Sequence, residues 1–387
     1  MKYTYMRRIT STDLSNWAPT RNCQENLPLL IRRLIRASID DVKKLLIPAG
    51  DNIILPGFDG TVELIKGTEY IPSGKSVWEI GSGINFKGKA QKDFKARTKD
   101  VDFTDANEIT YVFVTPYVWS KKGEWVNKKK QTDIWKDVVV IDGLILEEWI
   151  EQYPHVGVWL SKSLALPVAN IQPLDEFWNE WSKSIKFSIH PGLVISGREH
   201  EEKEITAFVG GSPRALTIKS FTDKEVIAFF AASVERLNDE LKERVYSRAI
   251  IVDNEEEFRI LISCPNHMIL IAKFETNSLV DLAIQNGHHV LIPVSNDITA
   301  VKDCIELPWI KRTGFEKGLE EMGFTFDERQ QVIRDSGQSL SVLRRLLGLE
   351  KNSQPEWAKQ GNHIDILPVL LAGMWKDFNE NDRKIIK

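Results

Sequence analysis

Two acidic residues of the sequence could together hold a metal ion. Asp59 lies in Pro-Gly-Phe-Asp-Gly, directly before one strand-like run, and Glu79 lies inside another, Ser-Val-Trp-Glu-Ile. A chain reversal over residues 67–75 would pair these runs as a hairpin and bring both carboxylates to one edge of a sheet. Carboxylate oxygens are the ligands that Mg²⁺ prefers, and a bound metal would activate water and stabilise charge building on a phosphodiester. The pair predicts metal-assisted hydrolysis, with Glu63 as an additional candidate ligand.

These residues also have purely structural interpretations. Gly-Phe-Asp-Gly is a good turn, and Glu79 could pair with a cation of the helix predicted over residues 89–99. A lysine near the two carboxylates, such as Lys89, would supply the remaining positive charge and stabilise charge building on the phosphate. Further contacts with nucleic-acid phosphates are predicted for basic residues of the same segment: Lys87, Lys92 and Arg97.

Residues 81–90, Gly-Ser-Gly-Ile-Asn-Phe-Lys-Gly-Lys-Ala, fall one residue short of the phosphate-binding pattern G-x-x-x-x-G-K-[ST]. Ala90 stands where a hydroxyl group should bind Mg²⁺, and alanine cannot ligate a metal. Nucleotide binding by this loop remains an alternative, and it requires the loop to wrap an anion at a helix N-terminus. We favour a role for Lys89 on a nucleic-acid backbone instead.

Composition limits the class of protein. The chain has 387 residues, of which 42% are apolar and 27% charged, and this balance is typical of two or three globular domains. The sequence contains no apolar run of about 18 residues, and its start lacks the apolar core of a secretory signal, so we expect no membrane partner. Three scattered cysteines, Cys23, Cys264 and Cys304, fit neither a disulfide framework nor a zinc site. These features together predict a cytoplasmic protein.

Charge is distributed unevenly along the chain. The net charge of −4 does not by itself indicate nucleic-acid binding. Residues 1–165, however, carry 24 Lys and Arg against 21 Asp and Glu, whereas the remaining residues carry 27 against 34. The basic residues of the first part cluster in 87–99 and 121–130, and such clusters can neutralise phosphates. A solvated helix face and a solvated loop are the alternative interpretation of these clusters.

The spacing of apolar residues predicts an α/β fold with two sheets. In the first part a helix is expected over 22–46 and another, broken at Pro154, over 144–164, with strands at 61–65, 76–80, 111–115 and 138–141. This pattern predicts a mixed sheet flanked by helices in a domain of residues 1–168. Residues 165–177 carry two prolines and predict a linker, which we place at 169–190.

A second α/β domain is predicted over residues 191–310. Its expected strands are 215–219, 248–252, 268–272 and 290–293, with helices between them. Residues 311–387 read as helical, in the manner of a lid or a winged helix. The helical pattern continues to the last residue without a stop signal, so we expect this chain to be the front part of a longer protein.

The segments Pro-Gly-Phe-Asp-Gly, Ser-Val-Trp-Glu-Ile-Gly and Lys-Ala-Gln-Lys-Asp-Phe-Lys-Ala-Arg-Thr resemble the PD-(D/E)XK nuclease superfamily in its restriction-endonuclease-like or Mrr-like form. The resemblance covers roughly residues 15–165. It implies that Asp59 is the metal-binding Asp and Glu79 the acidic residue of the E-x-K element. The lysine of that element would fall at position 81, where this chain has Gly81, and the resemblance implies that Lys89 takes its role.

Gly197-Arg198-Glu199 resembles the element that precedes the nucleotide loop of STAND and AAA-like NTPases. The strand and helix expected next are present, but residues 220–224, Ser-Phe-Thr-Asp-Lys, contain no Gly-Lys-Ser/Thr. The resemblance therefore implies a degenerate P-loop-NTPase-like domain that serves as a regulatory or oligomerisation scaffold. Arg344 and Arg345 would correspond to a sensor position, although an interface role fits them better.

The sequence thus predicts a metal-dependent DNA endonuclease effector. It would use Mg²⁺, or Mn²⁺ in its place, cut double-stranded DNA and form a homo-oligomer on activation. Nuclease-like domains fused to STAND-type modules occur in bacterial antiphage defence, and the resemblance implies that role. The alternatives are a catalytically inactive module that binds nucleic acid or protein, and an NTP-binding STAND protein.

Overall fold

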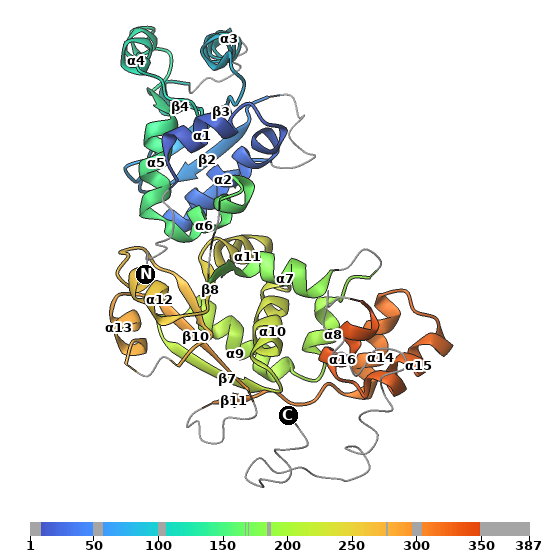
Figure 1. Ribbon diagram of the computed structural model, residues 1–387. Coiled ribbons are helices and arrows are strands. Elements are labelled where there is room, and N and C mark those ends of the chain that lie inside the picture. The colour runs from blue at the N-terminus through green and yellow to red at the C-terminus, as the bar shows by residue number, and fades with distance from the viewer. Residues whose placement is uncertain are drawn as a thin grey trace.

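The computed structural model describes residues 9–48, 57–99, 106–166, 168, 170–183, 187–275, 278–295 and 304–348. Figure 1 shows two layered α/β units, one built on a five-stranded sheet and one on a six-stranded sheet. The predicted α/β class is confirmed, with mixed sheets flanked by helices in both units. None of the helices in the described ranges is long and apolar enough to cross a membrane.

The first sheet has the strand order β1-β2-β3-β4-β5. Its strands are β1 (Val42–Leu46), β2 (Gly60–Leu64), β3 (Gly74–Ile80), β4 (Ile109–Val114) and β5 (Asp137–Ile141). The pairs β1·β2 and β2·β3 are antiparallel, whereas β3, β4 and β5 run parallel. The three parallel strands place their carboxyl ends at one edge of the sheet, which is the edge that carries Glu79.

Alternating side chains of this sheet face two separate cores. Trp78 and Val112 face a core covered by α1 (Ser11–Trp17), α2 (Arg21–Ser38), α5 (Gly143–Gln152) and α6 (Pro154–Ser163). Val77, Tyr111 and Phe113 face the other core, which is covered by α3 (Phe86–Lys99) and α4 (Lys122–Lys130). A strand with apolar residues on both faces is buried on both sides, as parallel strands usually are.

The helix expected over residues 22–46 is shorter in the structure. Thr20 caps its start by accepting a hydrogen bond from the Cys23 N–H at 3.1 Å, and α2 ends at Ser38. Residues 42–46 form β1 instead, paired with β2. The prediction was wrong there because strand pairing with a distant segment decides the conformation of so short a run, and local apolar spacing does not report that pairing.

The hairpin of β2 and β3 has the register needed for the two predicted carboxylates. Gly60 pairs with Trp78, so the next position places Asp59 opposite Glu79. The reversal at 67–75 requires glycine at Gly67, where a Cβ would lie 2.6 Å from the Ile71 carbonyl oxygen. The hairpin predicted from sequence is thus present, and the turn fixes its register.

The second sheet has the order β11-β7-β10-β9-β8-β6. Its strands are β6 (Ile171–Pro173), β7 (Ala215–Ser220), β8 (Ala249–Val252), β9 (Ile269–Ala272), β10 (His289–Ser295) and β11 (Ile305–Glu306). All neighbours are parallel except β6, which runs antiparallel to β8. Four of these strands match the predicted ones closely, and β6 and β11 escaped prediction because each has only two or three residues.

Residues 169–190, predicted as a linker, contain structure of the second unit. β6 pairs with β8, and α7 (Leu174–Ser182) buries Leu174, Trp178 and Trp181 in the core of that unit. Pro173 is the N-cap of α7 and so marks the start of a helix rather than an unstructured connection, because proline is tolerated before and in the first turn.

Helices surround the second sheet and continue past it. They are α8 (Pro191–Ile195), α9 (Glu199–Gly210), α10 (Asp223–Glu235), α11 (Asp239–Tyr246), α12 (Glu255–Ile262) and α13 (Val280–Gln285), followed by α14 (Arg312–Glu321), α15 (Phe326–Ser336) and α16 (Leu340–Leu346). The predicted helical character from residue 311 onward is confirmed as far as residue 346, and residues 349–387 lie outside the described part of the chain. Arg344 is buried and donates from Nε to the Trp181 carbonyl oxygen at 3.0 Å, so it serves an interface between α16 and α7.

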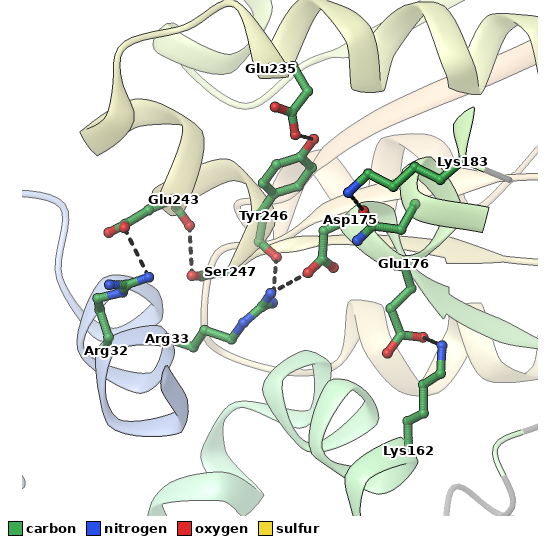
Figure 2. A network of polar contacts seen from close by, with 11 residues as sticks. Arg32, Arg33, Lys162, Asp175, Glu176, Lys183, Glu235, Glu243, Tyr246 and Ser247 are labelled. Atoms are coloured by element: carbon green, nitrogen blue, oxygen red, sulfur yellow. Dashed lines mark hydrogen bonds and ion pairs between the residues drawn. The ribbon is translucent and has the colours of Figure 1, made fainter. Parts of the chain in front are cut away.

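Two arginines of α2, Arg32 and Arg33, contact the second unit (Figure 2). Arg32 pairs with Glu243 of α11 at 3.3 Å, and Arg33 pairs with Asp175 of α7 and donates to the Tyr246 carbonyl oxygen. The guanidinium of Arg33 also lies 4.5 Å from the centre of the Trp159 ring. These contacts attach the helix behind the first sheet to the second unit.

Candidate active site

The predicted carboxylates Asp59 and Glu79 lie side by side at the edge of the first sheet. Asp59 Oδ2 accepts a hydrogen bond from the Ile80 N–H at 2.7 Å, which fixes its side chain across the hairpin. Glu79 is only 1% exposed, whereas Asp59 is 30% exposed. The site therefore has one buried carboxylate and one that reaches solvent.

Lys89 contacts both carboxylates. Its Nζ lies 3.6 Å from Asp59 Oδ2 and 3.9 Å from Glu79 Oε2, and it pairs more closely with Asp93 Oδ2 at 2.5 Å. A single ammonium group within 4 Å of both acids means that one cation can interact with the two carboxylates at once.

The side chain of Lys89 also occupies the space beside Gly81. A Cβ built on Gly81 would lie 3.3 Å from Lys89 Cδ, and 2.8 Å from Cζ of the buried Phe113 ring. Lys89 thus approaches the carboxylates through the region that a side chain at position 81 would enter. Helix α3 brings it there, since this helix begins at Phe86, three residues before Lys89, and packs on the sheet.

Arg97 lies two turns further along α3 and holds the buried carboxylate. Its Nε donates to Glu79 Oε1 at 2.5 Å, and its guanidinium also donates to the Gly57 carbonyl oxygen. The guanidinium packs 5.2 Å from the centre of the Phe58 ring, a cation–π distance. Glu79 therefore has an arginine partner, as the structural interpretation of the sequence anticipated.

Burial dominates the electrostatics of the site. It raises the pKa of Glu79 to about 7, and the negative charge of Asp59 adds to this effect while Arg97 and Lys89 oppose it. Burial also disfavours the Lys89 ammonium, but the carboxylates of Asp93, Asp59 and Glu79 outweigh it and raise the pKa of Lys89. Lys89 therefore remains a cation at neutral pH.

Two features of the site escaped prediction from sequence. Asp93 pairs with Lys89, and the only signal for it was its position one turn along the same helix. The hydroxyl of Tyr111 is buried beneath α3 with no hydrogen-bond partner in the described part of the chain. Burial raises the pKa of this phenol, and the nearby charges of Glu79 and Asp93 reinforce the effect.

Three other candidate residues lie apart from the carboxylate pair. Glu63 is near the far end of β2 and pairs with Lys43 at 2.5 Å, so the structure does not bring this predicted metal ligand to Asp59. Lys87 and Lys92 are exposed on α3, with Lys87 Nζ 5.6 Å from the centre of the Phe86 ring. Their exposed ammonium groups suit contact with a polyanion rather than a place among the carboxylates.

The donor set suits a weakly enclosed magnesium ion. Within the described ranges no group of three or more His, Cys, Asp or Glu side chains is arranged to hold a metal. Mg²⁺, however, keeps several waters and is commonly bound through one or two carboxylates, together with substrate phosphate. Asp59 and Glu79 fit that requirement, since both approach the same cation, Lys89.

The near match to a nucleotide loop has a different role in the fold. Helix α3 already begins at Phe86, whose ring is buried and stacks 5.0 Å from that of Tyr117. The second half of the stretch that a phosphate loop would wrap around an anion, residues 86–89, is thus already helical. Lys89 points from this helix to the carboxylates.

The second sheet holds a buried ion pair, closed to solvent, beside residues 220–224, where the sequence resemblance placed a nucleotide loop. At the carboxyl end of β7, Arg198 donates to Glu225 at 2.6 Å and to the Pro308 carbonyl oxygen at 2.8 Å, and both side chains are buried. Thr222 caps α10 by accepting from the Glu225 N–H. The adjoining cavity has a volume of about 50 Å³, little more than the space of one or two waters.

No family model, curated protein or solved structure matches this chain.

Proposed function

We propose that the first unit is a metal-dependent nuclease that hydrolyses phosphodiester bonds of DNA. The observation that supports this most is the position of Lys89. It reaches Asp59 and Glu79 together, and it does so through the space beside Gly81, where the E-x-K pattern calls for lysine. Two carboxylates can hold the metal for phosphodiester hydrolysis, and one lysine can stabilise the charge that builds on the phosphate.

Each residue has a defined role in this proposal. Asp59 and Glu79 would hold Mg²⁺, and Mn²⁺ could replace it because it also takes carboxylate and water ligands. The metal, when bound, supplies an activated water and stabilises charge on the phosphate. Lys89 is 41% exposed, so its ammonium can reach a phosphate oxygen without leaving the site. Arg97 orients Glu79 and presents further N–H groups to the substrate.

The surface around the site favours a nucleic-acid substrate. Helices α3 and α4 project from the same end of the first unit (Figure 1), and both pack on the core that contains Phe94 and Trp125. Each helix presents exposed lysines, among them Lys87, Lys92, Lys128 and Lys130. A pair of basic helices beside the carboxylates would bind the backbone of a duplex mainly by neutralising phosphates, which makes binding dependent on salt.

The test is cleavage of supercoiled and linear duplex DNA by the full chain in Mg²⁺, with Asp59→Asn and Glu79→Gln side by side. We expect cleavage that needs metal and that both substitutions abolish. Oligomeric assembly is measured in parallel, because an effector that needs activation is silent as a monomer. Metal-dependent cleavage that both variants retain would sink the proposal.

A non-catalytic module that binds DNA or protein is the second candidate. The observation that favours it is the close pairing of Glu79 with Arg97, which leaves this carboxylate already satisfied. Two measurements separate the candidates. A non-catalytic module would bind duplex DNA with unchanged affinity after Asp59→Asn, and it would cleave no DNA in any assembly state.

For the second unit we propose a STAND-like scaffold that has lost nucleotide binding. The supports are the absence of Gly-Lys-Ser/Thr in residues 220–224 and the Arg198–Glu225 pair beside a cavity of about 50 Å³. The scaffold would serve oligomerisation of the nuclease in antiphage defence. Titration with ATP and ADP should give no saturable binding, and saturable binding would support the NTP-binding alternative.

A further inference from the structure

The charged groups of the candidate active site are unequally free to move. Asp59 and Glu79 are attached to paired strands, and Glu79 is 1% exposed. Lys89 and Arg97 enter from α3 on long side chains that are 41% and 24% exposed. Any rearrangement on binding therefore moves the cations and leaves the carboxylates in place.

Three residues of α3 form one row that faces the carboxylates. Lys89, Asp93 and Arg97 follow each other at intervals of four, which places them on the same side of the helix. Lys89 lies between Asp93 and Asp59, whereas Arg97 holds Glu79. The row thus provides a counter-charge for each of the two carboxylates proposed to bind metal.

A divalent cation approaching this site competes with the protein's own cations. Lys89 and Arg97 repel it and already satisfy the oxygens that it needs. A phosphate group has the opposite effect, because ammonium and guanidinium groups form charge-assisted hydrogen bonds with phosphate oxygens. A phosphate that draws Lys89 and Arg97 toward itself leaves the carboxylates free for the metal.

We propose that the row Lys89, Asp93 and Arg97 couples metal binding to binding of nucleic-acid phosphate. The free protein binds Mg²⁺ weakly, and substrate and metal enter the site cooperatively. Asp93 acts as a positioning residue that keeps Lys89 beside the site in both states. This inference rests on the proposed nuclease function and adds to it a thermodynamic coupling between substrate and metal. Because coupling is reciprocal, Mg²⁺ must tighten DNA binding by the same factor as DNA tightens Mg²⁺ binding.

The experiment is calorimetric titration of the full chain with Mg²⁺ in the absence of DNA. Arg97→Gln should bind Mg²⁺ roughly 5- to 50-fold more tightly than the wild type, within the usual range of coupling between two sites. Lys95→Gln is the matched control, since it removes one exposed positive charge from the same helix. It should change the affinity less than about twofold in physiological salt, where screening is effective beyond roughly 8 Å.

A second titration uses a phosphorothioate DNA duplex, which keeps its charge and resists cleavage. The duplex should raise the Mg²⁺ affinity of the wild type and change that of Arg97→Gln much less. Lys89→Gln is the substitute if Arg97→Gln does not fold by circular dichroism. Equal Mg²⁺ affinities in wild type and both variants, with and without duplex, overturn the coupling.

Asp59→Asn separates this inference from the proposed function. Loss of Mg²⁺ binding in Asp59→Asn, together with an Arg97→Gln affinity equal to that of the wild type, overturns the coupling and leaves the nuclease proposal standing. Mg²⁺ binding that persists in Asp59→Asn, or no measurable binding by any of these proteins with duplex present, overturns both.

Discussion

The two sheets each hold a buried glutamate paired with an arginine, Glu79 with Arg97 and Glu225 with Arg198. The distances are alike, at 2.5 Å and 2.6 Å. The first pair adjoins Lys89 and Asp59, which are 41% and 30% exposed, whereas Arg198 is 3% exposed and donates its remaining hydrogen bonds to carbonyl oxygens. The first pair thus connects to charged groups that solvent can reach, whereas the second is closed to solvent.

Breaking the buried Arg198–Glu225 pair should have the largest effect on the free energy of unfolding. Glu225→Ala leaves the Arg198 guanidinium buried without its carboxylate, and removal of one partner of such a pair costs about 3–5 kcal/mol of the free energy of unfolding. Urea unfolding of the full chain measures it. Arg198→Met combined with Glu225→Leu is the control, since an apolar pair of similar volume should restore much of the loss. If Glu225→Ala has the same free energy of unfolding as the wild type, water must reach the Arg198–Glu225 pair.

Removing the exposed lysine should affect activity rather than stability. Lys89→Ala is expected to lower the rate of DNA cleavage about 10²- to 10³-fold, the usual cost of losing one preorganised group that stabilises transition-state charge. The free energy of unfolding should change by less than about 1 kcal/mol, because Lys89 is 41% exposed. Cleavage rates at saturating Mg²⁺ and a urea titration provide both values. A loss of stability as large as that of Glu225→Ala would mean that Lys89 has a mainly structural role, as the buried Arg198–Glu225 pair has.

The pH dependence of the free energy of unfolding should reveal the cost of burying the charged form of Glu79. Its pKa is raised to about 7 in the fold, against about 4.5 when exposed, so its stabilising contribution is complete below pH 4.5 and is lost as the pH rises through 7. In EDTA, the stability of Glu79→Gln relative to the wild type should therefore increase by up to about 3 kcal/mol between pH 4.5 and 8. Urea titrations across this range measure the difference, and a constant difference contradicts the assignment. Mg²⁺ should reduce the difference at pH 8.

The smallest of these effects is expected at the junction of the units. Arg33→Ala removes the contacts with Asp175 and Trp159 and should cost about 1–2 kcal/mol, since both charged side chains are largely buried. Arg21→Ala is the control, because its pair with Glu25 is exposed and should contribute less than about 0.5 kcal/mol. Thermal unfolding and limited proteolysis of residues 164–190 report the change. Equal effects of the two substitutions would show that the junction adds no stability.

The sequence supported prediction of the carboxylate pair because the hairpin depends on local signals. A glycine-rich reversal joins two apolar runs, and alternation then places Asp59 opposite Glu79. Lys89 was predicted because Gly81 stands where the E-x-K pattern has lysine and because Lys89 begins the helix predicted over residues 89–99. Asp93 was not predicted, since an acidic residue on a helix face pairs with solvent as readily as with lysine.

Elements that depend on distant partners were harder to predict. β1 exists because β2 pairs with it, and α7 is ordered by burial of its tryptophans among helices far along the chain. Lys129 shows the same limit: it reads as solvated, yet it is buried with its ammonium 4.7 Å from the centre of the Phe94 ring. Glu63 lies on the same face of the sheet as Glu79. It is four residues from Asp59, however, which is a separation of roughly 13 Å along a strand.

Arg248 adds a mechanical consequence to the junction. From the start of β8 its guanidinium donates to the Arg36 and Ala37 carbonyl oxygens, closing the last turn of α2. This helix has 18 residues and so spans about 27 Å, and its apolar side packs in the core beneath the sheet that carries Asp59. The second unit thus holds one end of a rigid helix that packs in the core of the first unit. A rotation of a few degrees at this end of α2 displaces the other end by an ångström or more, so movement of the second unit would be transmitted to the core beneath the candidate active site.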